Sequence, residues 1–350
     1  MRPMNQSLLL SEIYEQPSVI RRLVELEAGR VAGLGQALAR REIRYVVIAA
    51  RGSSDNAARY AQYVFGALNG LTVALATPSL YSVYEQGPRL DGALVLGISQ
   101  SGQSPDIVRV LEEGRRQGAP TVAITNDPDS PLARAAEHVI TLHAGEERSV
   151  AATKTYSAQL AALALLSTGL AEKPLQPGPL DAVPAAMEAA LAADAPARAA
   201  AERMAGSDRC VVLARGFNYA TGYETALKMK ELAYVVAEPY SSADFQHGPI
   251  AMVEAGFAVV LVAVGDAVRA ELAELRATLR RQGASLVVLG DAPALRDPAD
   301  AWVPVPGGVP EWLSPLVACI PGQLLAYHLA CVRGHDPDRP RTIHKVTLTR

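Results

Sequence analysis

The chain has 350 residues, of which 49% are hydrophobic and 20% charged, and its formal net charge is −3. At about 150 residues per domain, this length predicts two domains, and the composition is typical of a well-packed globular protein. The chain has no block of basic residues, which argues against a nucleic-acid partner.

The cysteines and the N-terminus point to one compartment. Cys210, Cys319 and Cys331 form no CxxC pair, and each lies in or beside an apolar segment. We therefore expect buried, reduced thiols in a cytoplasmic protein, and neither disulfides nor zinc ligands. Residues 1–17 contain one short leucine run followed by acidic residues, so we expect neither a signal peptide nor a membrane anchor.

Two pairs of matching segments indicate an internal repeat. Val47–Gly52 (VIAARG) matches Val211–Gly216 (VVLARG) at an offset of 164 residues. Arg115–Ala119 (RRQGA) recurs at Arg280–Ala284 at an offset of 165. Two matches at nearly one offset indicate duplication of a unit of that length.

Short β-branched runs alternate with amphipathic segments in both units. In the first unit we expect strands at Tyr45–Ala50, Leu71–Ala76, Ala93–Ser99 and Thr121–Thr125, and helices at Asp55–Leu68 and Pro105–Gln117. In the second we expect strands at Cys210–Ala214, Phe257–Val264 and Ser285–Leu289, and helices at Tyr219–Val236 and Val268–Arg281. Between them, Glu172–Pro184 holds four prolines and is predicted to be a linker, with a helix at Ala185–Met204. This alternation predicts α/β units with parallel sheets covered on both faces.

The loop that follows the strand at Ala93–Ser99 carries the strongest chemical signal. Leu94–Ser104 (LVLGISQSGQS) runs from apolar residues into serines, a glutamine and glycines. Ser104 is a natural helix cap and Pro105 suits the first helical position. Such a helix N-terminus binds phosphate, and the absence of lysine and of GxxxxGK[ST] favours a small phosphorylated metabolite over ATP. Asp106, in the first turn, counts against an anion here.

Hydroxyl groups are concentrated in the first unit. Its loops contain GSSDN and SQSGQS, whereas the corresponding loops of the second contain GFNYA and VGDAV. We therefore expect the first unit to hold phosphate and the second to supply other chemistry. Taken alone, Ser53 and Ser54 are explained by turn and cap preferences.

The second unit carries candidate acid–base groups. Glu224, Lys228 and Glu231 share one helical face, which is usually a solvated ion-pair face. The polar segment Ser241–Pro249 (SSADFQHGP) follows, and we expect the helix to point its end toward the same region. His247 within it is a plausible acid–base group. In the tail, Lys345 is either exposed or a cation or Schiff-base amine in a site.

These motifs together resemble the isomerase half of glucosamine-6-phosphate synthase and the type II glucosamine-6-phosphate deaminases. The matching stretches are ARGSSDNA, SQSGQSPD, SVAATKTY, ALKMKELAY, DFQHGP and HKVTLT, in the same order, from Arg51 to Thr349. The resemblance implies two tandem sugar isomerase (SIS) domains, each a flavodoxin-like, three-layer αβα sheet. It implies an N-terminal helical segment at 1–40, domains at 41–171 and 198–350, and a linker and helix at 172–197.

The resemblance also implies a role for each matching residue. The phosphate cradle is Ser54, Ser99, Gln100, Ser101 and Ser104, with Ser53 beside it, and the sugar-proximal loop contains Val150, Ala151 and Thr153. Glu231 is the base that moves a proton between C1 and C2, and Lys228 positions the sugar. His247 opens the ring and comes from the neighbouring subunit, which implies a homodimer with shared sites. Lys345 matches the lysine that forms a Schiff base with the keto sugar in the synthase.

The direction of the reaction follows from a departure from the synthase. Arg2 follows Met1 where the synthase has the nucleophilic cysteine of its glutaminase domain, so we expect no glutaminase. The resemblance then implies conversion of glucosamine 6-phosphate and water to fructose 6-phosphate and ammonia, without metal or other cofactor. The alternatives are a glutaminase-less relative of the aminotransferase, a deglycase acting on another amino-sugar phosphate, and a non-catalytic phosphosugar sensor.

Overall fold

The computed structural model describes residues 7–171, 178 and 180–345. The chain divides into two compact units, named here by their sheets. The sheet A unit comprises Ser18–Glu147, Lys154–Asp181 and His344–Arg350. The sheet B unit comprises Met1–Pro17, Arg148–Thr153 and Ala182–Ile343.

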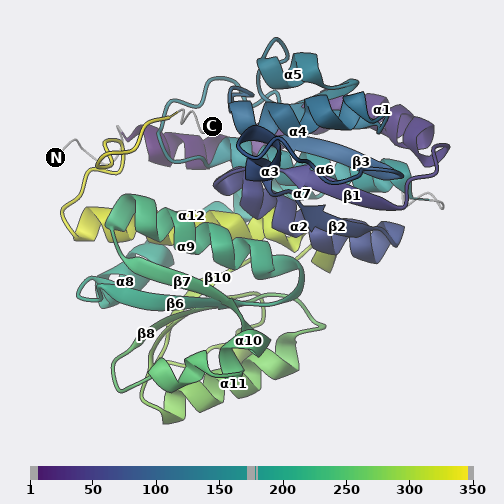
Figure 1. Ribbon diagram of the computed structural model, residues 1–350. Coiled ribbons are helices and arrows are strands. Elements are labelled where there is room, and N and C mark those ends of the chain that lie inside the picture. The colour runs from purple at the N-terminus through teal and green to yellow at the C-terminus, as the bar shows by residue number, and fades with distance from the viewer. Residues whose placement is uncertain (1–6, 172–177, 179, 346–350) are drawn as a thin grey trace. The chain divides into compact units, whose positions relative to one another are not determined.

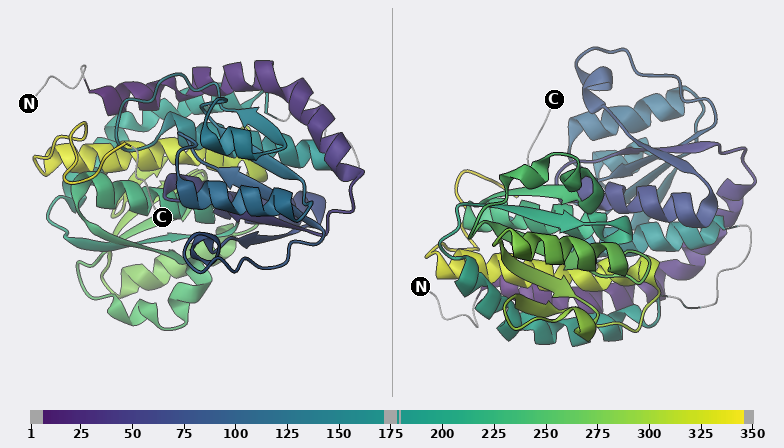
Figure 2. Two further views of the ribbon diagram at one scale, coloured as in Figure 1. Left: turned by 45° about the horizontal axis from the view of Figure 1, so that its top comes forward. Right: turned by 90° about the horizontal axis from the view of Figure 1, so that it is seen from below.

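Sheet A is parallel and five-stranded, in the order β2-β1-β3-β4-β5. Its strands are β1 (Tyr45–Ala49), β2 (Thr72–Leu75), β3 (Ala93–Ile98), β4 (Thr121–Thr125) and β5 (His138–Thr141). One face is covered by α3 (Pro78–Ser82), α4 (Pro105–Arg116) and α5 (Pro131–Ala135), and the other by α2 (Ser53–Asn69) and α6 (Lys154–Leu170) (Figures 1 and 2). Every residue of β3 and β4 is buried, as expected for central strands between two helical layers.

A long helix, α1 (Leu8–Ala39), precedes sheet A. Its second half packs against α6, where Gly35 faces Gly169. A Cβ atom at Gly35 would lie 2.2 Å from the carbonyl carbon of Gly169. Glycine is therefore required here for close approach of the two helix backbones.

Sheet B is also parallel and five-stranded, in the order β10-β9-β8-β6-β7. Its strands are β6 (Arg209–Ala214), β7 (Val236–Ser241), β8 (Ala258–Ala263), β9 (Ser285–Gly290) and β10 (Ala301–Pro304). One face is covered by α8 (Asp194–Met204), α9 (Tyr219–Ala233) and α12 (Ser314–Val332), and the other by α10 (Ser242–Gln246) and α11 (Arg269–Arg281) (Figure 1). Short 3-10 turns lie at Gly216–Asn218, Pro249–Met252, Pro293–Leu295 and Glu311–Leu313.

The two sheets are copies of one pattern. The first strands start at Tyr45 and Arg209, an offset of 164, and the central strands start at Ala93 and Ala258, an offset of 165. Each sheet has the same order when its strands are counted from its own first strand. The predicted fold class, two tandem α/β domains with parallel sheets between helical layers, is confirmed, and so is the repeat.

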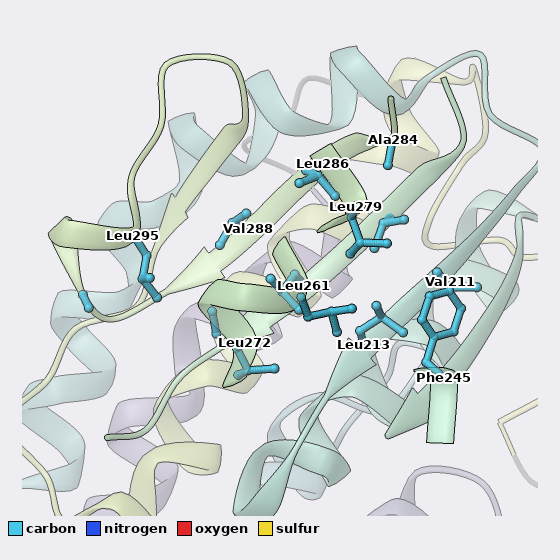
Figure 3. Packing of buried hydrophobic residues seen from close by; sticks show 14 residues of the cluster. Val211, Leu213, Phe245, Leu261, Leu272, Leu279, Ala284, Leu286, Val288 and Leu295 are labelled. Atoms are coloured by element: carbon cyan, nitrogen blue, oxygen red, sulfur yellow. The ribbon is translucent and has the colours of Figure 1, made fainter. Parts of the chain in front are cut away.

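The core of the sheet B unit lies between the strands and α11 (Figure 3). Alternate residues of β6, Val211 and Leu213, point to this side, as the two-residue period of a strand dictates. They meet Leu272 and Leu279 of α11 in a cluster that also contains Phe245. Each fully buried leucine contributes about 1.5–3 kcal/mol. This core fixes the strand ends from which the loops of the unit project.

The predicted helix at Tyr219–Val236 is too long. It ends at Ala233 because Tyr234 adopts the left-handed conformation, with φ of 56°. The edge strand β7 begins at Val236. It was not predicted because it contains Pro239 and leaves Val236 exposed, and only an edge strand tolerates proline in this way.

The predicted helix at Ala185–Met204 is interrupted. The structure has α7 (Val183–Ala190), a 3-10 turn at Leu191–Ala193 and then α8. Pro196 lies in the first turn of α8, where its missing N–H group is tolerated, but it could not continue an unbroken helix. Most of the predicted linker, residues 172–177 and 179, lies outside the described residues, as do residues 346–350, which include most of the HKVTLT motif.

Candidate active site

The predicted phosphate loop lies at the carboxyl end of β3, directly before α4. Ser104 occupies the cap position and Pro105 begins the helix, as predicted. The Ser104 side chain, however, makes no hydrogen bond to the helix N–H groups. Its hydroxyl is therefore left for other partners, which differs from the capping role expected from the sequence.

The loop is held open by its own hydroxyl groups. The Ser99 Oγ accepts from the Gly102 N–H at 3.1 Å, and the Ser101 Oγ accepts from the Gln103 N–H at 3.3 Å. A hydroxyl that accepts in this way keeps its own proton to donate. Phosphate oxygens only accept, so the loop presents the donors that phosphate needs.

Gly102 is the residue on which this loop conformation depends. It has a φ of 62°, and a Cβ atom at this position would lie 2.1 Å from the Ser130 Oγ. The Gln100 carbonyl accepts from the Asn126 N–H at 3.1 Å. The loop is thus fixed to the residues that follow β4.

Ser53 and Ser54 begin α2 at the same edge of sheet A. The Ser54 Oγ accepts from the Gln159 Nε2 at 3.0 Å, so a buried residue of α6 orients this hydroxyl. Because the carboxyl ends of β1 and β3 are neighbours, α2 and α4 both direct their N-termini to this edge. The sheet A unit therefore gathers all the predicted cradle residues at one edge.

The structure resolves the objection raised by Asp106. Its side chain is fully buried, and its Oδ2 accepts from Arg51 Nε at 2.9 Å and Nη2 at 2.7 Å. The charge in the first turn of α4 is thus paired with a cation from the loop after β1.

The corresponding place in the sheet B unit is differently built. There the Gly265 N–H donates to Asp291 at 3.0 Å, and the Ala267 N–H donates to Glu311 at 3.2 Å. Carboxylates of the protein itself thus occupy N–H groups before α11. This supports the expectation that phosphate binds in the first unit and not in the second.

The candidate base lies on α9. The Lys228 ammonium is 2.5 Å from Glu231 and 3.4 Å from Glu224. The Lys228 and Glu224 side chains are buried, whereas Glu231 is 25% exposed. Burial disfavours the charged lysine, but the two carboxylates outweigh it and raise the pKa of Lys228 above its ordinary value. The Glu231 carboxylate is therefore both fixed and accessible.

His247 follows α10 and is exposed. The expectation that α9 points its end toward this segment is wrong, because β7 intervenes. Residues 228–231 lie near the C-terminal end of α9, and six residues of strand, about 20 Å, separate the two ends of β7. Glu231 and His247 therefore lie near opposite ends of the edge strand β7 within one chain.

The predicted sugar-proximal loop belongs to the sheet B unit. Ala151 and Thr153 are buried, and Val150 is partly exposed. Glu12 of α1 holds this segment by accepting from the Arg148 N–H at 2.5 Å and from the Ser149 N–H at 3.2 Å. It also accepts from the Ser149 hydroxyl.

Lys345 is held in the sheet A unit. Its Nζ lies 2.6 Å from Glu147 Oε2, and the Glu147 side chain is fully buried. Glu147 is fixed by the Thr155 N–H and hydroxyl, at 3.1 and 2.7 Å. The tail lysine thus has a specific partner and is only partly exposed, at 24%; its role as a cation or Schiff-base amine in a site stays a prediction.

Two of these partners could have been found in the sequence. Arg51 lies in the repeated VIAARG segment, and the acid that it binds, Asp106, has a counterpart at Glu271, 165 residues on. In the structure Arg215 binds Glu271 at 3.0 Å, so the repeat carries the whole pair. Glu12 and Glu147 gave no such signal, because their partners are distant in sequence or lie in irregular segments.

Two surface cavities lie away from the predicted site residues. A cavity of about 540 Å³ is lined by Tyr81, Arg109 and Glu113, and one of about 680 Å³ by Asn126, His143 and Gly145. Neither is lined by a predicted site residue. Among the described residues, no group of three or more His, Cys, Asp or Glu could hold a metal ion.

One helix has the length and apolar character of a membrane span. In the part of the chain searched, Glu311–Val332 has a mean hydropathy of 1.5 over 18 residues, but 89% of that window is buried within the protein. It is accounted for as the core helix of the sheet B unit.

Comparison with known proteins defines the family. The model of the SIS domain matches residues 41–168 and again residues 203–333. The chain belongs to the SIS domain family. It is 34% identical over 351 residues to the glutamine–fructose-6-phosphate aminotransferase (isomerizing) of Pyrococcus horikoshii, covering 97% of this chain and 57% of that protein. The SIS chain thus spans little more than half the length of this relative and corresponds to its isomerase half.

Solved structures agree. A provisionally named phosphosugar isomerase from Silicibacter pomeroyi DSS-3 is 37% identical, with a TM-score of 0.85, over 95% of this chain and all of that one. The C-terminal domain of glucosamine-fructose-6-phosphate aminotransferase from Francisella tularensis is 26% identical, with a TM-score of 0.87, over 97% and 100%. The protein is thus a member of the phosphosugar isomerase family.

Proposed function

We propose that this SIS protein is an amino-sugar-phosphate deaminase and isomerase, which converts glucosamine 6-phosphate and water to fructose 6-phosphate and ammonia. The observation that carries the proposal is the Glu231 carboxylate, which Lys228 fixes while a quarter of it remains exposed. A base that carries a proton between adjacent carbons must be both held and reachable.

The proposed reaction begins with the cyclic sugar phosphate bound in the cradle of Ser99, Ser101 and Ser104. His247 protonates the ring oxygen as the C1–O5 bond breaks, the anomeric hydroxyl gives its proton to water, and the aldehyde forms at C1. Glu231 then removes the proton from C2 and returns it to C1, while one proton passes from the amine nitrogen to O1, which converts the 2-amino aldehyde to a 2-imine with a hydroxyl group on C1. Water adds to C2, the C–N bond breaks, and ammonia leaves with the ketose remaining.

Lys345 offers a covalent variant of the last step. Its unprotonated amine attacks C2 of the imine, ammonia is expelled, and water then hydrolyses the lysine–ketose Schiff base. The position of Lys345 at Glu147 supports this role, because the amine is held at 2.6 Å by a buried acid. Glu147 can accept the proton that the lysine must lose before attack.

The proposal includes a homodimer with shared sites and a cytoplasmic location. His247 is exposed and makes no side-chain hydrogen bond within the described part of the chain, and it lies near the opposite end of β7 from Glu231. A histidine supplied by a second copy would satisfy both observations. We retain the division into domains at 41–171 and 198–350 as part of the proposal.

The isomerase part of an aminotransferase is the second candidate. Its support is the 34% identity to a relative named glutamine–fructose-6-phosphate aminotransferase (isomerizing). The same residues would then run the exchange toward the amino sugar, with ammonia as a substrate. The two candidates differ in direction and not in the groups that carry the proton.

A coupled assay separates the possibilities. Purified protein is given glucosamine 6-phosphate, and fructose 6-phosphate and ammonia are followed together. Equal release of both, lost in Glu231→Gln and kept in Glu238→Gln, supports the deaminase, because Glu238 is exposed on an edge strand. Because a catalyst accelerates both directions of one reaction, the second candidate is distinguished by a low KM for ammonia in the amination of fructose 6-phosphate, as an enzyme that uses ammonia as a substrate requires. No turnover in either direction would reject both.

A further inference from the structure

The ion pair between Arg51 and Asp106 uses only some of the N–H donors of the arginine side chain. Its two hydrogen bonds to Asp106, from Nε and Nη2, go to the same carboxylate oxygen. Nη1 makes no hydrogen bond among the described residues, and the Arg51 side chain is 51% exposed while Asp106 is fully buried. Arginine presents five N–H donors in a planar fork, so a second face remains available.

The topology places this free face at the phosphate loop. β1 and β3 are neighbours in register, with Ala49 opposite Gly97. Arg51 and Ser99 therefore each lie two residues beyond paired positions, at the carboxyl edge of sheet A. The strand order reverses between β1 and β3, and this is where open α/β sheets bind their ligands.

A phosphate bound at residues 99–104 would lie near the negative charge of Asp106, so this loop requires a cation. Residues 99–104 contain no lysine or arginine, so the loop offers only neutral donors. A phosphate monoester carries nearly two negative charges near neutral pH, and Asp106 in the first turn of α4 adds a third. Repulsion between anions a few ångströms apart is large away from bulk water, and Arg51 supplies the opposing charge.

The second copy of the repeat shows what lies beside such a pair. Arg215 binds Glu271 at 3.0 Å, at the positions equivalent to Arg51 and Asp106. There the N–H groups of the adjacent loop are occupied by carboxylates of Asp291 and Glu311. The second copy thus supplies its own anions to these N–H groups, namely the carboxylates of Asp291 and Glu311. In the first copy the loop N–H groups of Gly102 and Gln103 bond instead to the neutral hydroxyls of Ser99 and Ser101, and an anion from outside would complete the loop.

We propose that Arg51 binds the substrate phosphate directly through its free face while its other face neutralises Asp106. The inference rests on the proposed phosphate cradle and adds to it a residue that sets its charge. The ligand class is a phosphate monoester in its dianionic form, for which a planar, permanently charged guanidinium is well suited.

A charge-neutral double variant tests this role. Arg51→Gln alone removes the guanidinium that faces the buried Asp106 carboxylate and is liable to unfold, whereas Arg51→Gln with Asp106→Asn removes both charges. Affinity for fructose 6-phosphate and for inorganic phosphate is measured by calorimetry at fixed salt, with thermal melting to establish folding. We expect the double variant to bind each ligand about tenfold or more weaker, because a charge-assisted hydrogen bond is lost. Asp106→Asn alone should bind at least as tightly as the parent.

Recovery of parental affinity in the double variant would overturn the proposal, since Arg51 would then act only by neutralising Asp106. The matched control is Arg215→Gln with Glu271→Gln, the equivalent pair in sheet B, which should leave phosphate affinity unchanged. Phosphate binding without deaminase turnover would reject the proposed reaction and keep the Arg51 inference testable by the same comparison of variants. Binding of neither phosphate ligand by the parent protein would reject both.

Discussion

The Lys228 ammonium lies 2.5 Å from one oxygen of Glu231, and the two side chains differ in exposure, at 1% and 25%. The two side chains therefore differ in environment: Lys228 is buried in the core, whereas the Glu231 carboxylate reaches the surface. The buried Glu224 carboxylate, 3.4 Å away on the other side, makes Lys228 the shared cation of two acids. Its roles in stability and in catalysis can therefore be separated by substitution.

Lys228→Met should destabilise the protein by about 3 kcal/mol, because it removes the cation of a buried ion pair. The measurement is urea unfolding, with Lys230→Met as the matched control. Lys230 is exposed on the same helix, and its loss should change the unfolding free energy by less than about 0.5 kcal/mol. Equal effects of the two substitutions would contradict a structural role for Lys228.

The difference in unfolding free energy between the parent protein and Lys228→Met should also depend on pH. The folded-state pKa of Lys228 is raised above its unfolded value of about 10.4. The stability that this shift contributes is fully present below that pH and is lost as the pH rises through the folded pKa. The difference in unfolding free energy between parent and Lys228→Met should therefore be constant from pH 6 to about 9 and shrink above about 10.4.

Shared active sites predict complementation between inactive variants. Glu231→Gln and His247→Asn should each lose activity by about 10²–10⁴-fold, as expected for acid–base groups. After mixing and subunit exchange, half of the dimers of a symmetric pair are mixed, and one of their two sites is intact, which restores about a quarter of parental activity. The measurement is turnover before and after exchange. Activity that stays at the level of the separate variants would show that His247 and Glu231 act within one chain, or that His247 is not used.

The sequence predicted the central strands and the edge strand β2, and missed the other three edge strands. The fully buried strands β3 and β4 were predicted because continuous apolar runs mark strands covered on both faces. The edge strands β5, β7 and β10 were not, because they are short or only partly buried, and β7 contains proline. Missing β7 caused the one error with a functional consequence, the expected proximity of the end of α9 to His247.

The candidate site was predicted unevenly for a similar reason. Residue types at a strand end and a helix N-terminus have local signals, so the hydroxyl loop was found at Ser99–Ser104. Contacts between residues distant in sequence have no such local signal. Glu147 contacts Lys345 at a separation of 198 residues, and Glu12 contacts Ser149 at a separation of 137 residues. Such contacts are fixed by tertiary packing, and only a repeat, as for Arg51 and Asp106, makes them visible in one sequence.

The tail lysine gives a chemical prediction. Borohydride added in the presence of fructose 6-phosphate should reduce a Schiff base and attach the sugar covalently to the peptide that contains Lys345. Peptide mass spectrometry measures the site, and Lys345→Ala should abolish it. In Glu147→Gln, trapping should be slower, because the acid that holds the amine can no longer take its proton. Trapping at another lysine, or none in the active parent enzyme, would contradict the covalent variant and leave the proton transfer by Glu231 unaffected.

Gly102 allows backbone strain and steric overlap at the phosphate loop to be separated. Gly102→Ala places a Cβ atom 2.1 Å from the Ser130 Oγ at a φ of 62°. Gly118→Ala is its matched control, since Gly118 has a φ of 77° and no atom within 4 Å of its Cβ position. Both should cost about 1 kcal/mol for the left-handed conformation, and Gly102→Ala should lose a further 1–3 kcal/mol from overpacking.

Because the hydroxyls of Ser99 and Ser101 are oriented by the N–H groups of Gly102 and Gln103, Gly102→Ala should also weaken binding of fructose 6-phosphate, whereas Gly118→Ala should not. Urea unfolding and calorimetry measure the two effects, and parental phosphate affinity in a folded Gly102→Ala protein would show that the loop conformation does not set the cradle.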